Sequence, residues 1–97
     1  MINASNDASG RTTVTILGRF NFACYDEFHR VVGATEPSTY FIDLRKVDYI
    51  DSAALGMLLL LRERVKEDRA RITLATGPGQ PADVLKLANF GSLFTMA

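Results

Sequence analysis

Residues 40–61 read YFIDLRKVDYIDSAALGMLLLL, and this stretch decides the fold. It opens with a short apolar run over 40–44, which is typical of a buried strand. Its second half has apolar residues at helical spacing, preceded by Asp51 and Ser52, two residue types that favour the start of a helix. A buried strand followed by a helix predicts a β–α unit.

Similar patterns flank this unit on both sides. Residues 1–7 and 12–18 alternate apolar and polar side chains, as two strands joined by a turn over 8–11 would. We expect helices over 23–34, 52–68 and 82–88, a strand over 71–76, and a last short strand over 93–96. Pro81 suits the first turn of the last helix. The order strand–strand–helix–strand–helix–strand–helix predicts an α/β fold with a sheet packed against helices.

Composition limits the class of protein. The 97 residues suit one domain over 1–97, and 47% hydrophobic residues supply a core. Eleven basic residues balance 11 acidic ones, which gives no electrostatic footprint for a nucleic acid. Cys24 is the single cysteine, so we expect no internal disulfide. The start of the chain lacks a signal-peptide pattern and the apolar run 57–61 is too short to cross a bilayer, so we expect no membrane insertion and a cytoplasmic protein.

The predicted helix over 52–68 has two unlike sides. With Leu58 inward, the core stripe consists of Ala54, Leu55, Leu61 and Val65. The opposite side carries Ala53, Gly56, Leu60, Glu63 and Glu67, with Met57 on the shoulder. A smooth patch of small and apolar residues suits close approach by a protein partner, and a helical glycine costs about 1 kcal/mol relative to alanine. The simpler hypothesis is that Leu60 is an ordinary exposed leucine and that Gly56 lets a neighbouring element pack.

The Asp51–Ser52 step has two interpretations. Either residue can cap the helix by accepting a hydrogen bond from a free backbone N–H. Alternatively, Ser52 is a phosphorylation site, because a helix N-terminus tolerates a phosphate. A phosphate would add about −1.5 to −2 charges beside Asp48 and Asp51 and would turn off binding without unfolding the domain. The residues alone leave both interpretations open.

The segment over 43–57, DLRKVDYIDSAALGM, resembles the central motif of the STAS family, the anti-sigma factor antagonists of bacteria. Residues 17–20 and 87–94 resemble two further family segments, so the resemblance covers nearly the whole chain. It implies a single STAS domain with a mixed, mostly parallel sheet. It also implies that a serine kinase, itself the anti-sigma factor, phosphorylates Ser52, and that a PP2C-type phosphatase reverses this.

The resemblance further implies that Asp51, Ser52 and the helix start over 53–57 contact the partner, and the helical projection extends this contact to Leu60. The full set is Asp51, Ser52, Ala53, Gly56, Met57 and Leu60. The chain departs from the family at Ala53 and Ala54, where many members have Ser and Gly, and at Asn21, where many have an acid. These departures leave the identity of the partner open.

Catalytic motifs are not found in the sequence. His29 is the single histidine and is expected on a helix surface, and no Cys/His spacing suggests a metal site. Ser52 is not part of a G-x-S-x-G step, so we expect no enzyme activity and no cofactor. Three hypotheses stay open: a phospho-switched binding module, a constitutive subunit of a larger complex such as a lipid transporter, and a nucleotide-binding domain using the loop 77–80. A homo-oligomer is compatible with each.

Overall fold

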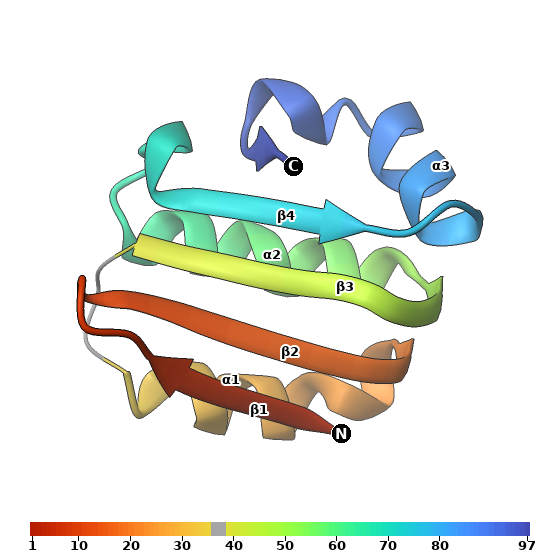
Figure 1. Cartoon of the computed structure of the whole chain (residues 1–97). Helices are drawn as coiled ribbons and strands as arrows, with labels where there is room; N and C mark the ends of the chain where they lie inside the picture. Colours follow the sequence, from red (N-terminus) through yellow and green to blue (C-terminus); the bar gives the residue numbers. More distant parts are fainter. Residues whose placement is uncertain (36–38) are drawn as a thin grey trace.

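A computed structural model describes residues 1–35 and 39–97, which form one five-stranded sheet with helices (Figure 1). The strands are β1 (Ile2–Asn6), β2 (Arg11–Phe20), β3 (Thr39–Ile50), β4 (Ile72–Thr76) and β5 (Thr95–Met96). The α-helices are α1 (Tyr25–Gly33), α2 (Ser52–Arg64) and α3 (Gln80–Leu87). Short 3₁₀ turns are η1 (Phe22–Cys24), η2 (Arg69–Arg71) and η3 (Phe90–Ser92).

The sheet has the strand order β1-β2-β3-β4-β5. β1 is antiparallel to β2, and every later neighbour is parallel. The crossovers through α1 and α2 step in the same direction, so right-handed connections place both helices on the same side of the sheet. Figure 1 shows these two helices behind the sheet and α3 beyond β4. The predicted α/β fold with a mixed, mostly parallel sheet is therefore confirmed.

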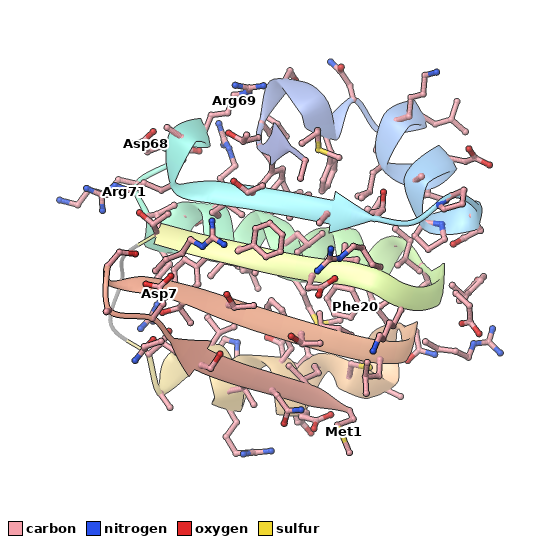
Figure 2. All side chains as sticks on the ribbon, in the orientation of Figure 1. Met1, Asp7, Phe20, Asp68, Arg69 and Arg71 are labelled. Carbon is pink, nitrogen blue, oxygen red and sulfur yellow. The ribbon has the colours of Figure 1, made fainter. Side chains whose placement is uncertain are left out.

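The core lies between the sheet and the helices. Its β2 and β3 members include Val14, Ile16, Phe20, Ile42 and Leu44, each with no exposed side-chain surface. The opposite face of the sheet, turned toward the viewer in Figure 2, is half-buried and carries no helix in the described chain. On that face the Phe41 ring lies between two guanidinium groups, with Arg11 at 4.7 Å and Arg45 at 6.0 Å from its centroid.

β3 is longer than the sequence pattern predicted. We expected the strand to end at residue 44, but it continues to Ile50. Two register shifts against β2 occur between Thr15 and Leu17 and between Gly18 and Arg19, and β3 supplies one extra residue at each. Such bulges reverse the direction in which the following side chains point.

The bulges explain the burial pattern of β3. Buried positions alternate as far as Leu44 and then fall three residues apart, at Val47 and Ile50. A regular strand would have turned Lys46 and Asp48 inward instead. Because the strict alternation stops at Leu44, the sequence pattern did not reveal the second half of the strand, which carries the chain to Asp51.

α2 is shorter than predicted and ends at Arg64, not at residue 68. Lys66 and Glu67 adopt left-handed conformations, with φ of 58° and 61°. The Glu67 N–H donates to the Arg62 carbonyl at 2.8 Å and the Lys66 N–H donates to the Glu63 carbonyl at 3.0 Å, which is the Schellman pattern of a helix end. Glycine usually occupies the left-handed position of this motif, so lysine at this position is no recognisable stop signal.

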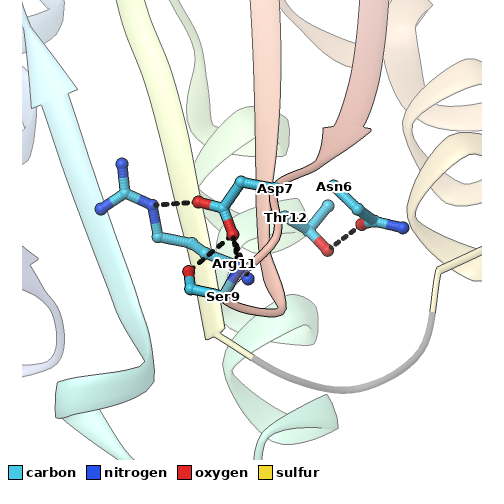
Figure 3. A network of polar contacts seen from close by, with 5 residues as sticks. All are labelled: Asn6, Asp7, Ser9, Arg11 and Thr12. Carbon is cyan, nitrogen blue, oxygen red and sulfur yellow. Dashed lines mark hydrogen bonds and ion pairs between the residues drawn. The ribbon is translucent and has the colours of Figure 1, made fainter.

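The hairpin between β1 and β2 is closed by a polar network (Figure 3). The Asp7 carboxylate accepts hydrogen bonds from the Ser9 N–H at 2.9 Å, the Ser9 hydroxyl at 2.6 Å and the Arg11 N–H at 3.0 Å. These bonds, the Ser9 hydroxyl foremost, lower the pKa of Asp7. The Thr12 hydroxyl donates to the Asn6 amide oxygen at 2.7 Å. The turn therefore fixes the register of β1.

The remaining boundaries differ from the predicted ones by at most two residues. α3 begins at Gln80, with Pro81 in its first turn as predicted. The final strand covers Thr95–Met96 alone, because the chain before it forms η3. Among the described helices, none has the length and apolar character needed to cross a membrane.

Asp43 and Arg45 on the open face predict a pH-dependent contribution to stability. The Arg45 side chain donates hydrogen bonds to the carboxylate at 2.9 and 3.0 Å, which lowers the pKa of Asp43. A pKa below the unfolded value stabilises the fold above about pH 3.9 and loses this effect as the pH falls through the folded value. Asp43→Asn should lower the melting temperature by a few degrees at neutral pH, and the difference from wild type should vanish in strongly acidic buffer.

The matched control is Asp48→Asn, because Asp48 is exposed and forms no ion pair within the described residues. Circular dichroism melting curves measure both variants. An Asp43→Asn deficit that is as large in acid as at neutral pH would contradict the assignment.

Candidate functional site

Asp51 holds the junction between β3 and α2 from two sides. One carboxylate oxygen accepts a hydrogen bond from the Ala54 N–H at 2.9 Å, which caps α2. The other accepts a hydrogen bond from the Phe22 N–H at 3.2 Å, in the turn η1. The predicted cap is confirmed for Asp51. The bond to Phe22 connects positions 29 residues apart and fixes where α2 begins relative to α1.

Gln80 holds the residue before Asp51 from the other side of the junction. Its side-chain amide donates to the Ile50 carbonyl and accepts from the Ile50 N–H, both at 2.8 Å. A Cβ at Gly77 would lie 3.3 Å from the Arg45 carbonyl oxygen, so this loop packs closely on β3. The residues of the loop 77–80 therefore have structural roles in positioning the start of α2.

Ser52 is the first residue of α2 and is exposed to solvent. Within the described chain no hydrogen bond engages its hydroxyl. The free backbone N–H groups of a first helical turn and the helix dipole favour negative charge at such a position. The geometry thus gives a reagent free access to the Ser52 hydroxyl, while Asp51 beside it is held by two hydrogen bonds.

The side of α2 that follows Ser52 is smooth and accessible. Ala53 is half-buried, Gly56 is exposed, and 45% of Leu60 is exposed. A Cβ added at Gly56 would meet no atom within 4 Å. The hypothesis that Gly56 lets a neighbouring element pack is therefore wrong for the described chain. Glu63 lies on the same side and is exposed, as predicted, whereas Glu67 lies beyond the helix end.

Met57 is buried, contrary to its predicted place on the shoulder of the exposed side. Its side chain is 2% exposed and belongs to the core. The core stripe of α2 is Ala54, Met57, Leu58, Leu61 and Val65, and Leu55 is half-buried at its border. The stripe is rotated toward α1 because α2 packs against that helix as well as against the sheet. Met57 therefore supports the candidate surface from below and does not form its outer layer.

A groove of about 350 Å³ runs between α1 and α2, beside this surface. Its floor is apolar and consists of Phe28, Val32, Met57, Leu60 and Leu61. Its rim carries His29, Glu63 and Arg64. Sequence reasoning missed this groove because it arises where two helices meet, and the pattern of either helix alone does not show it.

A row of aromatic side chains borders the groove on the α1 side. Phe22 is 72% exposed, and its ring lies 6.4 Å from that of Tyr25 at an interplanar angle of 26°. Tyr25 in turn stacks on His29 at 5.6 Å and 15°. The exposed position predicted for His29 is confirmed. The row begins at the residue whose N–H binds Asp51, so it adjoins the start of α2.

The spacing of these three residues in the sequence is a signal for the row. Phe22, Tyr25 and His29 are three and four residues apart, which places them on one side of a helix. The core residues Phe28 and Val32 have the same four-residue spacing on another side. We name the combined surface the docking surface, and it consists of Phe22, Tyr25, His29, Asp51, Ser52, Ala53, Gly56 and Leu60.

The described residues contain no group of three or more His, Cys, Asp or Glu side chains placed to hold a metal ion. Cys24 is half-buried, and its thiol lies 3.2 Å from the Arg19 carbonyl oxygen, to which it donates. The polar groups of this region thus hold the loop that follows β2 in place.

Comparisons with known proteins agree on one family. Residues 4–95 match the family described as the Mlab STAS domain. A STAS-domain containing protein of Pseudomonas aeruginosa is 38% identical over 99 residues, which cover 99% of this chain and 98% of that protein.

Two solved structures share the fold. The anti-sigma factor antagonist SpoIIAA in its unphosphorylated form gives a TM-score of 0.73 at 14% identity, covering 100% of this chain and 87% of that one. An uncharacterised protein from Shewanella loihica with a SpoIIAA-like fold gives 0.56 at 14% identity, covering 99% and 82%.

The two hydrogen bonds of Asp51 predict a measurable loss of stability on truncation. Asp51→Ala removes the cap of α2 and the bond to η1, so the free energy of unfolding should fall by about 1–2 kcal/mol. Asp51→Asn keeps one acceptor oxygen and should recover part of the loss. Ser52→Ala is the matched control and should leave stability unchanged, because the Ser52 hydroxyl is exposed and makes no bond in the described chain. Urea unfolding measures all three, and equal losses for Asp51→Ala and Ser52→Ala would contradict the prediction.

Proposed function

The chain belongs to the STAS domain family. We propose that it is a regulatory protein of the anti-sigma factor antagonist type, which binds a partner through the docking surface. The surface has the composition that suits protein recognition: exposed aromatic rings beside a smooth helix start and an apolar groove. A partner side chain that enters the groove would meet Leu60 and the buried Met57. The protein acts by binding and carries out no reaction of its own.

We further propose that reversible phosphorylation of Ser52 switches this binding. The partner is a serine kinase that is also an anti-sigma factor, and a PP2C-type phosphatase removes the phosphate. This set of partners places the protein in the cytoplasm. Phosphorylation adds about −1.5 to −2 charges at the border of an apolar surface, next to Asp51. A partner that fits the neutral hydroxyl then meets like charge and an uncompensated desolvation penalty.

One observation carries this proposal. The Ser52 hydroxyl is exposed and unbonded in the described chain, whereas the Asp51 carboxylate is fixed on η1 and on α2. A phosphate on Ser52 therefore replaces no interaction that holds the fold. The charge of the surface changes while its shape persists, which is what a binding switch requires.

The second candidate is a STAS subunit of a larger complex, such as a lipid transporter, that assembles through the same surface without regulation by phosphate. The two functions differ in how binding responds to charge at Ser52. A nucleotide at the loop 77–80 is not proposed, because Gln80 already binds Ile50 and Gly77 packs on β3.

The switch predicts that one Ser52 variant keeps partner binding and the other loses it. A pull-down with the unmodified protein should recover a kinase-type partner, Ser52→Ala should recover it equally, and Ser52→Asp should lose at least about tenfold in affinity because it places a carboxylate at the surface border. The recovered kinase should label the wild type and not Ser52→Ala. Labelling that survives Ser52→Ala would refute phosphorylation at this residue. Equal binding by Ser52→Asp and wild type would favour the constitutive subunit.

The extent of the docking surface predicts the effect of a charge at its far end. Leu60→Glu places a carboxylate over the groove and should abolish capture of the partner under both candidate functions. Leu87→Glu is the matched control, since Leu87 on α3 is 87% exposed and lies outside the docking surface. Both variants should melt within a few degrees of wild type. Capture that Leu60→Glu leaves intact, or that Leu87→Glu abolishes, would place the contact elsewhere.

A further inference from the structure

The outer edge of β1 offers unpaired backbone groups. The Leu17 N–H donates to the Met1 carbonyl at 3.0 Å and the Asp7 N–H donates to the Arg11 carbonyl at 2.9 Å. In an antiparallel pair, alternate residues direct their backbone groups toward the partner strand. With the observed register, Asn3 and Ser5 therefore face β2, and the N–H and C=O groups of Ile2, Ala4 and Asn6 point away from the sheet. Figure 1 shows no strand on this side of β1.

This edge lacks the usual protection against pairing. Natural edge strands carry lysine, proline or an inward charge that discourages a second strand. β1 reads INASN and contains none of these. Among the described residues, one hydrogen bond engages its outward backbone groups: the Glu27 carboxylate of α1 accepts from the Ile2 N–H at 3.2 Å.

The helix beneath the edge carries two opposite charges. Glu27 and Arg30 line a groove between β1 and α1, and they are three residues apart on that helix. Neither takes part in an ion pair within the described residues. Because α1 returns antiparallel to β2, it runs in the same direction as β1. Glu27 is level with Ile2, and Arg30, three residues or about 4.5 Å further along the helix, is near Ala4.

We propose that β1 pairs antiparallel with β1 of a second copy of this chain, with Ile2 opposite Ala4 of the second copy. Both residues have outward backbone groups, so each pair exchanges two N–H···O bonds across a two-fold axis at Asn3. The same axis brings Glu27 of each copy to Arg30 of the other. In the dimer, the Ile2 N–H donates to the Ala4 carbonyl of the second copy instead of to Glu27. The Glu27 carboxylate then pairs with the Arg30 guanidinium of the second copy.

Charge complementarity favours this register over the next possible one, in which the two-fold axis lies at Ala4. An axis at Ala4 would also pair outward-facing residues, but it would bring Arg30 against Arg30 of the second copy and leave Glu27 without a cation. Like charges at an interface oppose association. The zero net charge of the chain adds no overall repulsion between copies.

The dimer leaves the docking surface free. Tyr25 and His29 lie on one side of α1, whereas Glu27 and Arg30 lie on the opposite side by their helical spacing and line a different groove. The paired strands are short, so the contact is small and the dimer is weak and concentration-dependent. The proposed dimer does not depend on the proposed function, so an experiment that refutes one of them leaves the other standing.

The test is sedimentation equilibrium of the full chain from micromolar to millimolar concentration, where wild type should pass from monomer to dimer. Glu27→Arg leaves two cations in the groove and Arg30→Glu leaves two anions, so each alone should weaken self-association by about tenfold or more. An equimolar mixture of the two single variants should form a mixed dimer. The double variant Glu27→Arg/Arg30→Glu should dimerise like wild type.

Ala4→Pro tests the backbone pairing independently of charge. The Ala4 N–H faces solvent in the monomer, and proline is tolerated at such an edge position, so the variant should fold and remain monomeric. Circular dichroism confirms folding. Wild type that stays monomeric at millimolar concentration would overturn the proposal. Dimerisation that survives Ala4→Pro, or charge variants that associate alike alone and mixed, would also overturn it.

Discussion

The Asp51 carboxylate joins two segments that are far apart in the sequence, and the rest of the candidate site depends on this. Its two oxygens accept one hydrogen bond from the first turn of α2 and one from η1 before α1. The pair of bonds at Ile50, made by Gln80 of α3, holds the preceding residue. Three elements thus converge on two adjacent residues, and Ser52 is the next position, exposed and unconstrained at its hydroxyl. Because these hydrogen bonds hold the backbone around Ser52 and do not involve its hydroxyl, a group added to that hydroxyl would change the charge of the surface and not its shape.

Much of this arrangement could be predicted from the sequence, because local signals decide it. The cap at Asp51 follows from residue type and the core positions of Ala54 and Leu61 follow from helical spacing, and these predictions agree with the structure. The second half of β3 could not be predicted, since its bulges break the alternation that identifies a strand. The end of α2 was missed because Lys66 occupies a position where glycine is the usual signal. Both wrong predictions concern backbone conformations that cannot be recognised from the residue types at those positions.

The errors at the site have a different cause, which is packing between helices. A projection of α2 with one buried stripe against the sheet predicts Met57 on the shoulder of the exposed side, whereas in the structure α1 covers a second strip of the helix that includes Met57. The groove was missed for the same reason, because it exists only where α1 and α2 lie together. The aromatic row, in contrast, lies within residues 22–29, and its spacing is visible in the sequence. The Phe22 N–H connects this row to Asp51 at the start of α2, and a backbone hydrogen bond of this kind cannot be predicted from a side-chain pattern. Contacts between helices of this kind can be predicted only once the order and direction of the strands and helices are known.

α1 borders three different parts of the molecule. Three sides of this nine-residue helix have different roles: Phe28 and Val32 pack in the core, Tyr25 and His29 form part of the docking surface, and Glu27 and Arg30 flank the edge of β1. The two proposed surfaces would act together, since a dimer joined at β1 presents two docking surfaces. A partner that is itself dimeric would bind such a pair with an avidity above that of one site, provided that the spacing of its two sites matches. Weak self-association would then make partner capture depend on the concentration of this protein as well as on the state of Ser52.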